Sequence, residues 1–339
     1  MIFSFSPFSS GSKGLIHILR VFGDKIISPS LKSINLSRNE AIGPEFDFCT
    51  GGLSRPLFPF ATDFDFSACR LNAKTSASLA EALIDQGSAT TRQLTIRLNG
   101  NNLTDCRSFQ QMMRILLKSL TVHELHISSC NIGDPGLQSL EQLEYAPSIQ
   151  TLDLSNNNLT VAGIHALTAS PCFSNLRRLN LAGNSFIEKN ANSSKTACAW
   201  LAACIQNGPL DSLRDLDVSQ TFCGIEGAKA LLGCRSSLKV LTLFGNRLGS
   251  DGFVALSKDL EGGHPRLESL DLGGNEATEA GVVALLQSLT RPQQNEQTNT
   301  LRLLVVGGNQ GGPTVEIVVG EIKRLHPEID VARDKPRQT

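Results

Sequence analysis

One eleven-residue spacing of apolar residues constrains this chain more than any other feature. Residues 149–159, IQTLDLSNNNL, follow the frame L-x-x-L-x-L-x-x-N-x-L, and residues 238–248, LKVLTLFGNRL, repeat it. Self-similarity of this kind is the sequence signature of a repeat architecture. One unit cannot bury its apolar face alone, whereas stacked units bury a continuous core. The sequence therefore predicts a solenoid of stacked repeats.

The frame recurs in ten units, whose ninth positions lie about 30 residues apart on average. Seven units carry asparagine there, and these residues form a predicted structural ladder: Asn39, Asn101, Asn157, Asn184, Asn246, Asn275 and Asn309. Cys69, Cys130 and Thr221 take this position in the other three units. Because an amide both donates and accepts hydrogen bonds, we expect each asparagine to bond the backbone of its own turn and of the next unit. Thiol and hydroxyl groups would hold the turn more weakly.

Each unit also predicts a strand followed by a helix. Alternate residues of a strand share one face, so the fourth and sixth frame positions should point inward and the fifth outward. A glycine six residues after the ninth position, as at Gly252 and Gly281, allows close packing where a helix begins. Leucines such as Leu256 and Leu285 follow four residues later among helix-forming residues. We therefore expect an α/β fold with parallel strands on a concave face and helices on a convex face.

Three segments differ from this rhythm along the chain. Residues 1–30 are expected to form an N-terminal cap, with a helix near 15–22, or a remnant of a preceding repeat. The solenoid is expected over 31–325, interrupted by insertions at 42–60, 188–195 and 291–300 that are rich in Gly and Pro or in polar residues. Residues 326–339 are expected to be a flexible tail.

The strand motif, the patterned helix and the repeat length resemble the ribonuclease-inhibitor-like leucine-rich repeats over roughly 31–325. The resemblance implies a horseshoe-shaped solenoid. A narrower resemblance joins FDFSACRLNAKTSASLAEAL and LTIRLNGNNLTD to the leucine-rich part of the actin capping-protein linker family. That family's membrane-binding and capping-protein-binding segments have no counterpart here, so its actin-regulating activity is not implied for this chain alone.

Composition narrows the classes of function. The formal net charge is -1, which gives no bulk electrostatic attraction for nucleic acid. The sequence contains no run of about 20 apolar residues, so we expect no membrane-spanning helix. Nine cysteines without a C-x-x-C pair are typical of reduced thiols in a cytoplasmic protein. The phosphate-loop, G-x-S-x-G and H-E-x-x-H motifs are absent, so we expect no catalytic residue, no metal site and no cofactor.

A rigid sheet of outward side chains is the expected binding surface. At the fifth frame position, Asp153, Asp217 and Asp271 predict an acidic row suited to a basic partner. The alternative is that aspartate is simply common there in this repeat type. Other candidates on this face are Arg97, His126, Arg178 and Phe244. Phe244 is either an exposed hot spot or a residue packed across a neighbouring strand.

Two further positions have structural interpretations. His123 and His126 lie three apart on a strand and should face opposite sides, which disfavours a shared metal. Trp200 lies at helical spacing with Ile205, and we expect it to face the core.

The sequence thus predicts a monomeric, non-catalytic scaffold that binds another protein on its concave face. Three alternatives remain open at this point. They are an actin-regulatory fragment, a regulator of a small GTPase, and the sensor half of a nucleotide-binding receptor. A regulator like the Ran GTPase-activating proteins would carry an acidic tail, whereas this tail is mixed in charge.

Overall fold

The structure is a computed structural model. It consists of two compact units, unit 1 (Met1–Leu176) and unit 2 (Arg177–Thr339). It describes residues 2–4, 30–40, 42–43, 58, 60–84, 92–119, 121–143, 148–186, 197–234, 237–261, 266–290 and 299–333. The predicted helix at 15–22 and the insertion at 188–195 lie outside these residues, as do most of the insertions at 42–60 and 291–300.

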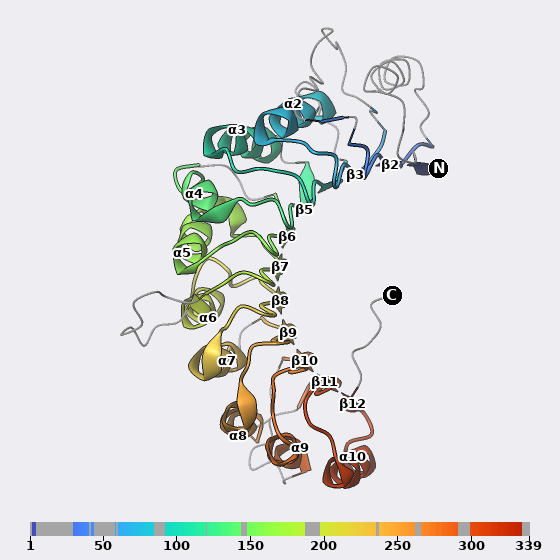
Figure 1. Cartoon of the computed structure of the whole chain (residues 1–339), viewed down its shortest axis with the longest axis vertical. Coiled ribbons are helices and arrows are strands. Elements are labelled where there is room, and N and C mark those ends of the chain that lie inside the picture. Colours follow the sequence, from blue (N-terminus) through green and yellow to red (C-terminus); the bar gives the residue numbers. More distant parts are fainter. Residues whose placement is uncertain are drawn as a thin grey trace. The chain divides into compact units, whose positions relative to one another are not determined.

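Unit 1 alternates short strands with helices, and its strands pair in parallel in chain order. Its strands are β1 (Ile2–Ser4), β2 (Ser33–Asn35), β3 (Asp63–Asp65), β4 (Leu94–Arg97), β5 (Val122–His126) and β6 (Thr151–Asp153). Its helices are α2 (Ala73–Leu83), α3 (Cys106–Lys118), α4 (Gly133–Gln138), α5 (Val161–Ala169) and the short η1 (Pro171–Phe173). The helices lie on one side of the strands (Figure 1).

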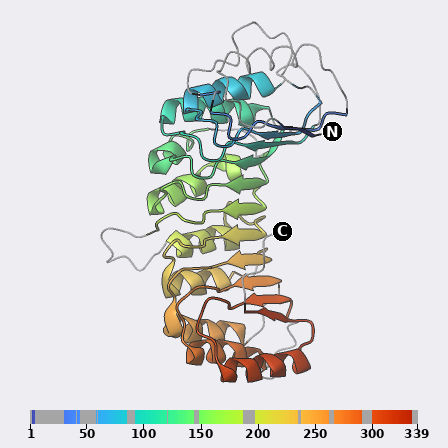
Figure 2. The same ribbon diagram turned by 45° about the vertical axis from the view of Figure 1, so that its right-hand side comes forward.

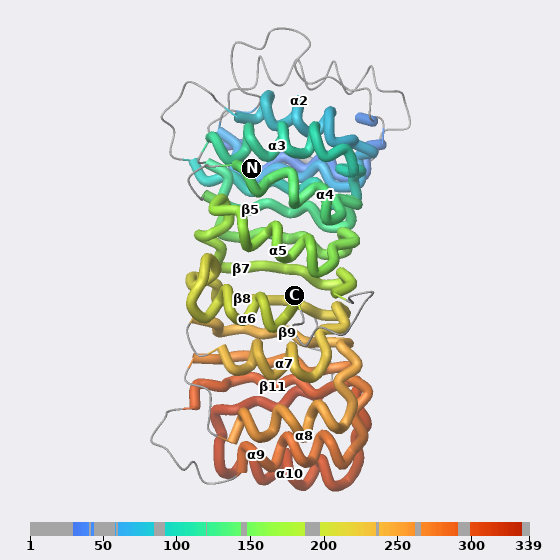
Figure 3. Tube along the Cα trace, turned by 90° about the vertical axis from the view of Figure 1, so that its left-hand side faces the viewer, coloured from blue at the N-terminus to red at the C-terminus, as the bar shows by residue number. Residues whose placement is uncertain are grey.

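Unit 2 follows the same plan, with parallel strands that also pair in chain order. Its strands are β7 (Arg178–Asn180), β8 (Asp215–Asp217), β9 (Val240–Thr242), β10 (Ser269–Asp271), β11 (Leu303–Val305) and β12 (Asp330–Ala332). Its helices are α6 (Ala197–Asn207), α7 (Gly224–Leu232), α8 (Gly249–Leu260), α9 (Glu279–Thr290) and α10 (Pro313–Leu325). Figure 2 shows its strand arrows side by side, and Figure 3 shows its helices in succession.

The core lies between strands and helices, where the frame predicted it. Leu152, Leu154, Leu241 and Leu243, at fourth and sixth positions, are all buried. The predicted helix leucines, among them Leu256, are buried against them. Glycine permits the helices to pack closely, because a Cβ on Gly281 would lie 2.8 Å from the Ser250 Cα of the preceding helix.

The asparagine ladder joins each turn to the preceding unit. The Asn275 Oδ1 accepts from the backbone N–H of Asn246 at 2.8 Å and of Leu248 at 3.4 Å. Its Nδ2 donates to the Leu243 carbonyl of that same unit at 3.0 Å, and to the carbonyls of Leu272 and Gly273 in its own turn. The predicted bonds to the next unit are therefore wrong in direction, since the amide reaches back along the chain.

Cysteine and threonine replace only the donor half of this arrangement. The Cys130 Sγ donates to the Leu98 carbonyl at 3.2 Å, and the Thr221 Oγ1 donates to the Val218 carbonyl at 2.8 Å. Neither side chain accepts from the preceding turn. Instead, the backbone carbonyl of Cys130 accepts from the N–H of Leu103 at 2.8 Å. A backbone acceptor thus substitutes for the missing Oδ1.

The C-terminal segment differs from the flexible tail predicted over 326–339. Residues 330–332 form β12, which pairs with β11, and Ile329 and Val331 are buried. Val331 pairs in register with Leu304, so it takes the inward position of a further partial repeat. The mixed charge of this segment concealed the two apolar residues that hold it.

Replacing a ladder asparagine with alanine should destabilise the fold more than replacing it with cysteine. Asn275→Ala leaves the N–H groups of Asn246 and Leu248 without their side-chain acceptor, which should lower the free energy of unfolding by about 2–5 kcal/mol. Asn275→Cys keeps a donor and should lose less. Urea denaturation measures both variants, and an equal loss in the two would contradict this role.

Candidate binding surface

The outward fifth-position residues form one continuous row in each unit, which we call the central row. Strand register places Asn35, Asp65, Arg97, His126 and Asp153 on neighbouring strands of unit 1. Register likewise aligns Asn180, Asp217, Thr242, Asp271 and Val305 in unit 2. The frame therefore assigned these positions correctly. Most are partly exposed, whereas Val305 is buried, with 2% of its surface accessible.

The aspartates of the central row cap their own turns. The Asp217 Oδ1 accepts from the Ser219 N–H at 2.8 Å and from the Ser219 hydroxyl. Asp153 bonds Ser155 in the same way, and the Asp271 Oδ1 accepts from the Gly273 N–H at 2.7 Å. Asparagine performs this role at Asn35 and Asn180. Where a side chain at this position caps the turn, a neutral amide oxygen serves as well as a carboxylate, so the aspartates supply a charge beyond the structural need.

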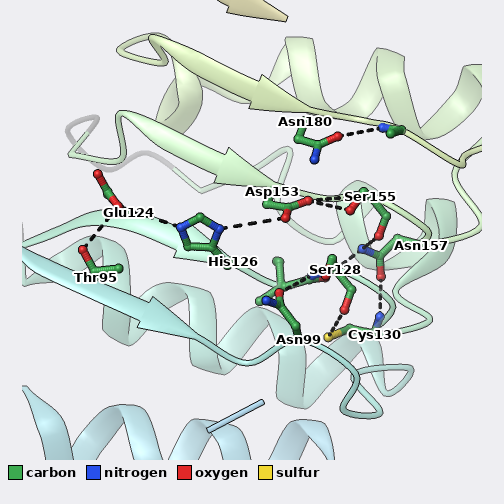
Figure 4. A network of polar contacts seen from close by, with 12 residues as sticks. Thr95, Asn99, Glu124, His126, Ser128, Cys130, Asp153, Ser155, Asn157 and Asn180 are labelled. Carbon is green, nitrogen blue, oxygen red and sulfur yellow. Dashed lines mark hydrogen bonds and ion pairs between the residues drawn. The ribbon is translucent and has the colours of Figure 1, made fainter. Parts of the chain in front are cut away.

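Unit 1 gathers three ionisable side chains on this face (Figure 4). The His126 Nδ1 lies 3.9 Å from the Asp153 Oδ2, and its Nε2 lies 3.8 Å from the Glu124 Oε2. These are distances of charge contacts rather than of hydrogen bonds. The Nε2 atom is buried and has no hydrogen-bond partner in the described part of the chain. The imidazole therefore lies between the carboxylates of Glu124 and Asp153.

This environment lowers the pKa of Asp153. Burial alone raises the pKa of its carboxyl, but the neighbouring His126 and the two hydrogen bonds from Ser155 outweigh burial and leave the pKa below its usual value. In unit 2 the opposite holds for Asp215. Burial raises its pKa, and Asp217 adds to the rise, while Arg178 opposes it. The pKa of Asp153, in the central row of unit 1, and that of Asp215, two residues before the central row of unit 2, are therefore shifted in opposite directions.

The remaining predicted residues lie on the same outward face. Arg97 forms an ion pair with Asp63 of the neighbouring strand, so its charge is partly compensated. Arg178 is exposed and lies in register with Asp215.

Phe244 packs across the neighbouring strand, as the second of its two interpretations held. A Cβ on Gly274 would lie 2.9 Å from its ring, and one on Gly273 would lie 3.0 Å away. Phe244 keeps partial exposure. The adjoining glycines thus accept an aromatic ring that side chains would displace.

Two aromatic residues lie where the sequence did not place them. Trp200 is 41% exposed, so its predicted core position is wrong, because the core face of α6 passes through Cys198, Leu201 and Ile205 instead. Phe222 is 40% exposed and follows the ninth position of its unit. Its backbone has φ +58°, and the guanidinium of Arg247 lies 5.0 Å from its ring centroid. The exposure of Phe222 could have been predicted from its position, because it directly follows the ninth residue of its unit, where the chain turns.

The described cysteines are free thiols, and all but Cys106 are buried. Burial raises the pKa of Cys69 and of Cys130 to about 12, and that of Cys234 to about 11. These three thiols are therefore protonated near neutral pH, in which state a cysteine is a poor nucleophile. Among the described residues, no three His, Cys, Asp or Glu side chains are arranged to hold a metal ion.

Comparison with known proteins agrees with this geometry. A family model described as "Leucine Rich repeat" matches residues 118–140 and 145–167. Ribonuclease inhibitor from the pig, Sus scrofa, is 26% identical over an alignment of 326 residues, and the match covers 87% of this chain and 68% of that protein. The chain carries leucine-rich repeats and is similar to ribonuclease inhibitor.

One solved structure shows the same fold for this repeat protein. The leucine-rich repeat-containing protein LegL7 from Legionella pneumophila matches with a TM-score of 0.57 and 19% identity, over 98% of this chain and 99% of that one. A chain of the yeast Rad7 and Elc1 complex matches with a TM-score of 0.44 and 16% identity, over 96% of this chain and 88% of that one.

No helix in the described residues has the length and apolar character needed to cross a bilayer.

The turn-capping role predicts a difference between two substitutions of Asp217. Asp217→Asn keeps the Oδ1 acceptor, so the free energy of unfolding should stay within about 0.5 kcal/mol of the wild type. Asp217→Ala leaves the Ser219 N–H without this acceptor and should lose about 1 kcal/mol. Urea denaturation measures both variants. Equal stability of the Asn and Ala variants would show that the cap contributes nothing.

The shifted carboxyl groups predict opposite pH dependences. Because folding lowers the pKa of Asp153, its charged form adds stability above its unfolded pKa, and this is lost as pH falls through the folded value. The stability of wild type minus that of Asp153→Asn should therefore decrease between about pH 5 and pH 3. Since folding raises the pKa of Asp215, the corresponding difference for Asp215→Asn should increase as pH falls. Chemical denaturation across this range measures both, and parallel curves would contradict the assignment.

Proposed function

We propose that this chain is a non-catalytic scaffold that binds a protein partner on the outward face of its strands. The observation that carries the proposal is the central row. Its side chains project from paired strands, and hydrogen bonds within each turn fix Asp153, Asp217 and Asp271 before any partner arrives. A preorganised surface loses little conformational entropy on binding, which favours affinity.

The charge of the central row points to a basic partner surface. Asp217 and Asp271 lie two strands apart in unit 2, with only the neutral Thr242 between them. Asparagine would serve the turn equally well, as Asn35 and Asn180 show, so the aspartates add a charge that complementary recognition can use. In unit 1, Asp153, His126 and Arg97 are the charged or polar residues of the corresponding face. In unit 2, Arg178 adds a positive group.

Similarity supports the same class of function. The pig relative is a ribonuclease inhibitor. A ribonuclease is accordingly a first candidate partner, and the proposed setting is the cytoplasm with a monomeric scaffold. Phe244, half-buried beside its glycines, offers an apolar contact next to the acidic positions.

Affinity capture with charge-neutralising variants tests the proposal. The wild type and Asp153→Asn/Asp217→Asn/Asp271→Asn are immobilised, and proteins retained from a native extract, as well as added ribonuclease, are identified by mass spectrometry. The asparagines preserve the turn caps, so the variant should remain folded and lose the partner. Binding of the purified partner should weaken about tenfold or more in the variant.

A matched control removes equal charge away from the central row. Asp211→Asn/Asp251→Asn/Glu321→Gln alters three exposed acids, and it should keep the partner. Retention of the partner by both variants would move the site away from the central row. Absence of any specific partner for the wild type would contradict the scaffold itself.

A further inference from the structure

A second charged row runs along unit 2 beside the central row, at the start of each strand. It consists of the second frame positions, Arg177, Arg214, Lys239, Glu268 and Arg302, and we call it the basic row. Backbone hydrogen bonds between successive repeats show that these residues are neighbours. The N–H of Arg214 donates to the Arg177 carbonyl at 2.9 Å, that of Lys239 to Arg214 at 2.7 Å, that of Glu268 to Lys239 at 2.7 Å, and that of Arg302 to Glu268 at 2.8 Å.

The basic row is exposed and only partly neutralised. All five residues are exposed, in contrast to the half-buried members of the central row. Lys239 forms an ion pair with Glu268. Within the described residues, the side chains of Arg177, Arg214 and Arg302 have no hydrogen-bond or ion-pair partner. Three guanidinium groups are therefore available to a ligand.

The repeat itself does not require this charge. In unit 1 the corresponding second positions are Lys32, Thr62, Leu94, His123 and Gln150, so the described part of that unit has one Lys or Arg where unit 2 has four. In the part of the chain that the structure describes, no turn hydrogen bond uses the side chains of Arg177, Arg214 or Arg302. A binding role accounts for cations that the fold leaves unused.

We propose that the basic row binds an extended acidic segment of a protein partner. Adjacent strands lie about 4.8 Å apart, so the four steps from Arg177 to Arg302 span about 19 Å, the length of about six extended residues. Guanidinium groups bind carboxylates through paired hydrogen bonds, and arginine suits such contacts better than lysine. The segment would run across the strands, with carboxylates facing successive arginines.

The surroundings favour a peptide over a nucleic acid. The central row lies three residues farther along each strand, or about 10 Å away, where Asp217 and Asp271 would repel phosphates of a wide polyanion. Single-stranded nucleic acid binds where aromatic side chains stack its bases. The second and third frame positions described in unit 2 carry no aromatic residue. A narrow acidic peptide fits one line of cations without meeting Asp217 and Asp271 of the central row.

The inference rests on the proposed function in taking the ligand to be a protein, but it uses residues outside the central row. A fluorescein-labelled oligoglutamate of about twelve residues serves as the probe, with fluorescence anisotropy as the readout. The full-length wild type should bind it, and affinity should fall with added salt. Arg177→Gln/Arg214→Gln/Arg302→Gln should weaken binding about tenfold.

Matched variants separate the basic row from bulk charge and from the central row. Lys258→Gln/Lys323→Gln/Arg324→Gln removes three exposed cations from α8 and α10, and it should bind within about twofold of the wild type. The Asp153/Asp217/Asp271 asparagine variant should also retain the peptide, even if it loses its own partner. Circular dichroism and thermal unfolding verify that every variant is folded.

Three outcomes would overturn the inference. They are no binding of oligoglutamate by the wild type, equal weakening in both cation variants, or tighter binding of a single-stranded oligothymidylate of similar length that depends on the same arginines. The last outcome would assign the basic row to nucleic acid instead.

Discussion

The backward hydrogen bonds of the asparagine ladder are the interaction on which the rest of this structure depends. A strand of three residues makes few bonds of its own, and the turn that follows it would bury several backbone groups without partners. One amide side chain serves donors and acceptors of two successive repeats at once, as Asn275 does for the turns at 246 and 275. Where cysteine or threonine stands instead, the backbone carbonyl supplies the acceptor. The stack is therefore bonded between turns as well as between strands.

This interlocking makes the outward face usable for recognition. Inward leucines and the ladder hold each repeat, so the outward positions are released from packing and vary between units. Aspartate at the fifth position combines both demands, because one oxygen caps the turn while the carboxylate contributes charge. Asn180 performs the structural half of that task alone. The difference between Asp and Asn at this position is thus a difference in surface charge on an unchanged backbone.

The frame predicted those features that recur in every repeat. Spacing alone located the buried Leu152 and Leu241 and the outward Asp217, because strand periodicity assigns a face to every residue once one is fixed. The frame did not predict features that occur in only one repeat. Trp200 was assigned to the core from helical spacing, which several rotations of a short apolar helix satisfy equally well. The strand at 330–332 has too few apolar residues to stand out from a polar tail.

The direction of the ladder hydrogen bonds could not be predicted from the frame, for a different reason. Spacing states that an asparagine occurs in every turn, but a side chain reaches forward or backward according to the handedness with which repeats stack. That same direction has a consequence for how the protein forms. The turn at Asn246 obtains its acceptor only when Asn275 is in place, twenty-nine residues later in the chain. Each repeat is completed by its successor, so during synthesis the newest turn stays open until the next one leaves the ribosome, and the ordered structure advances in the direction of translation.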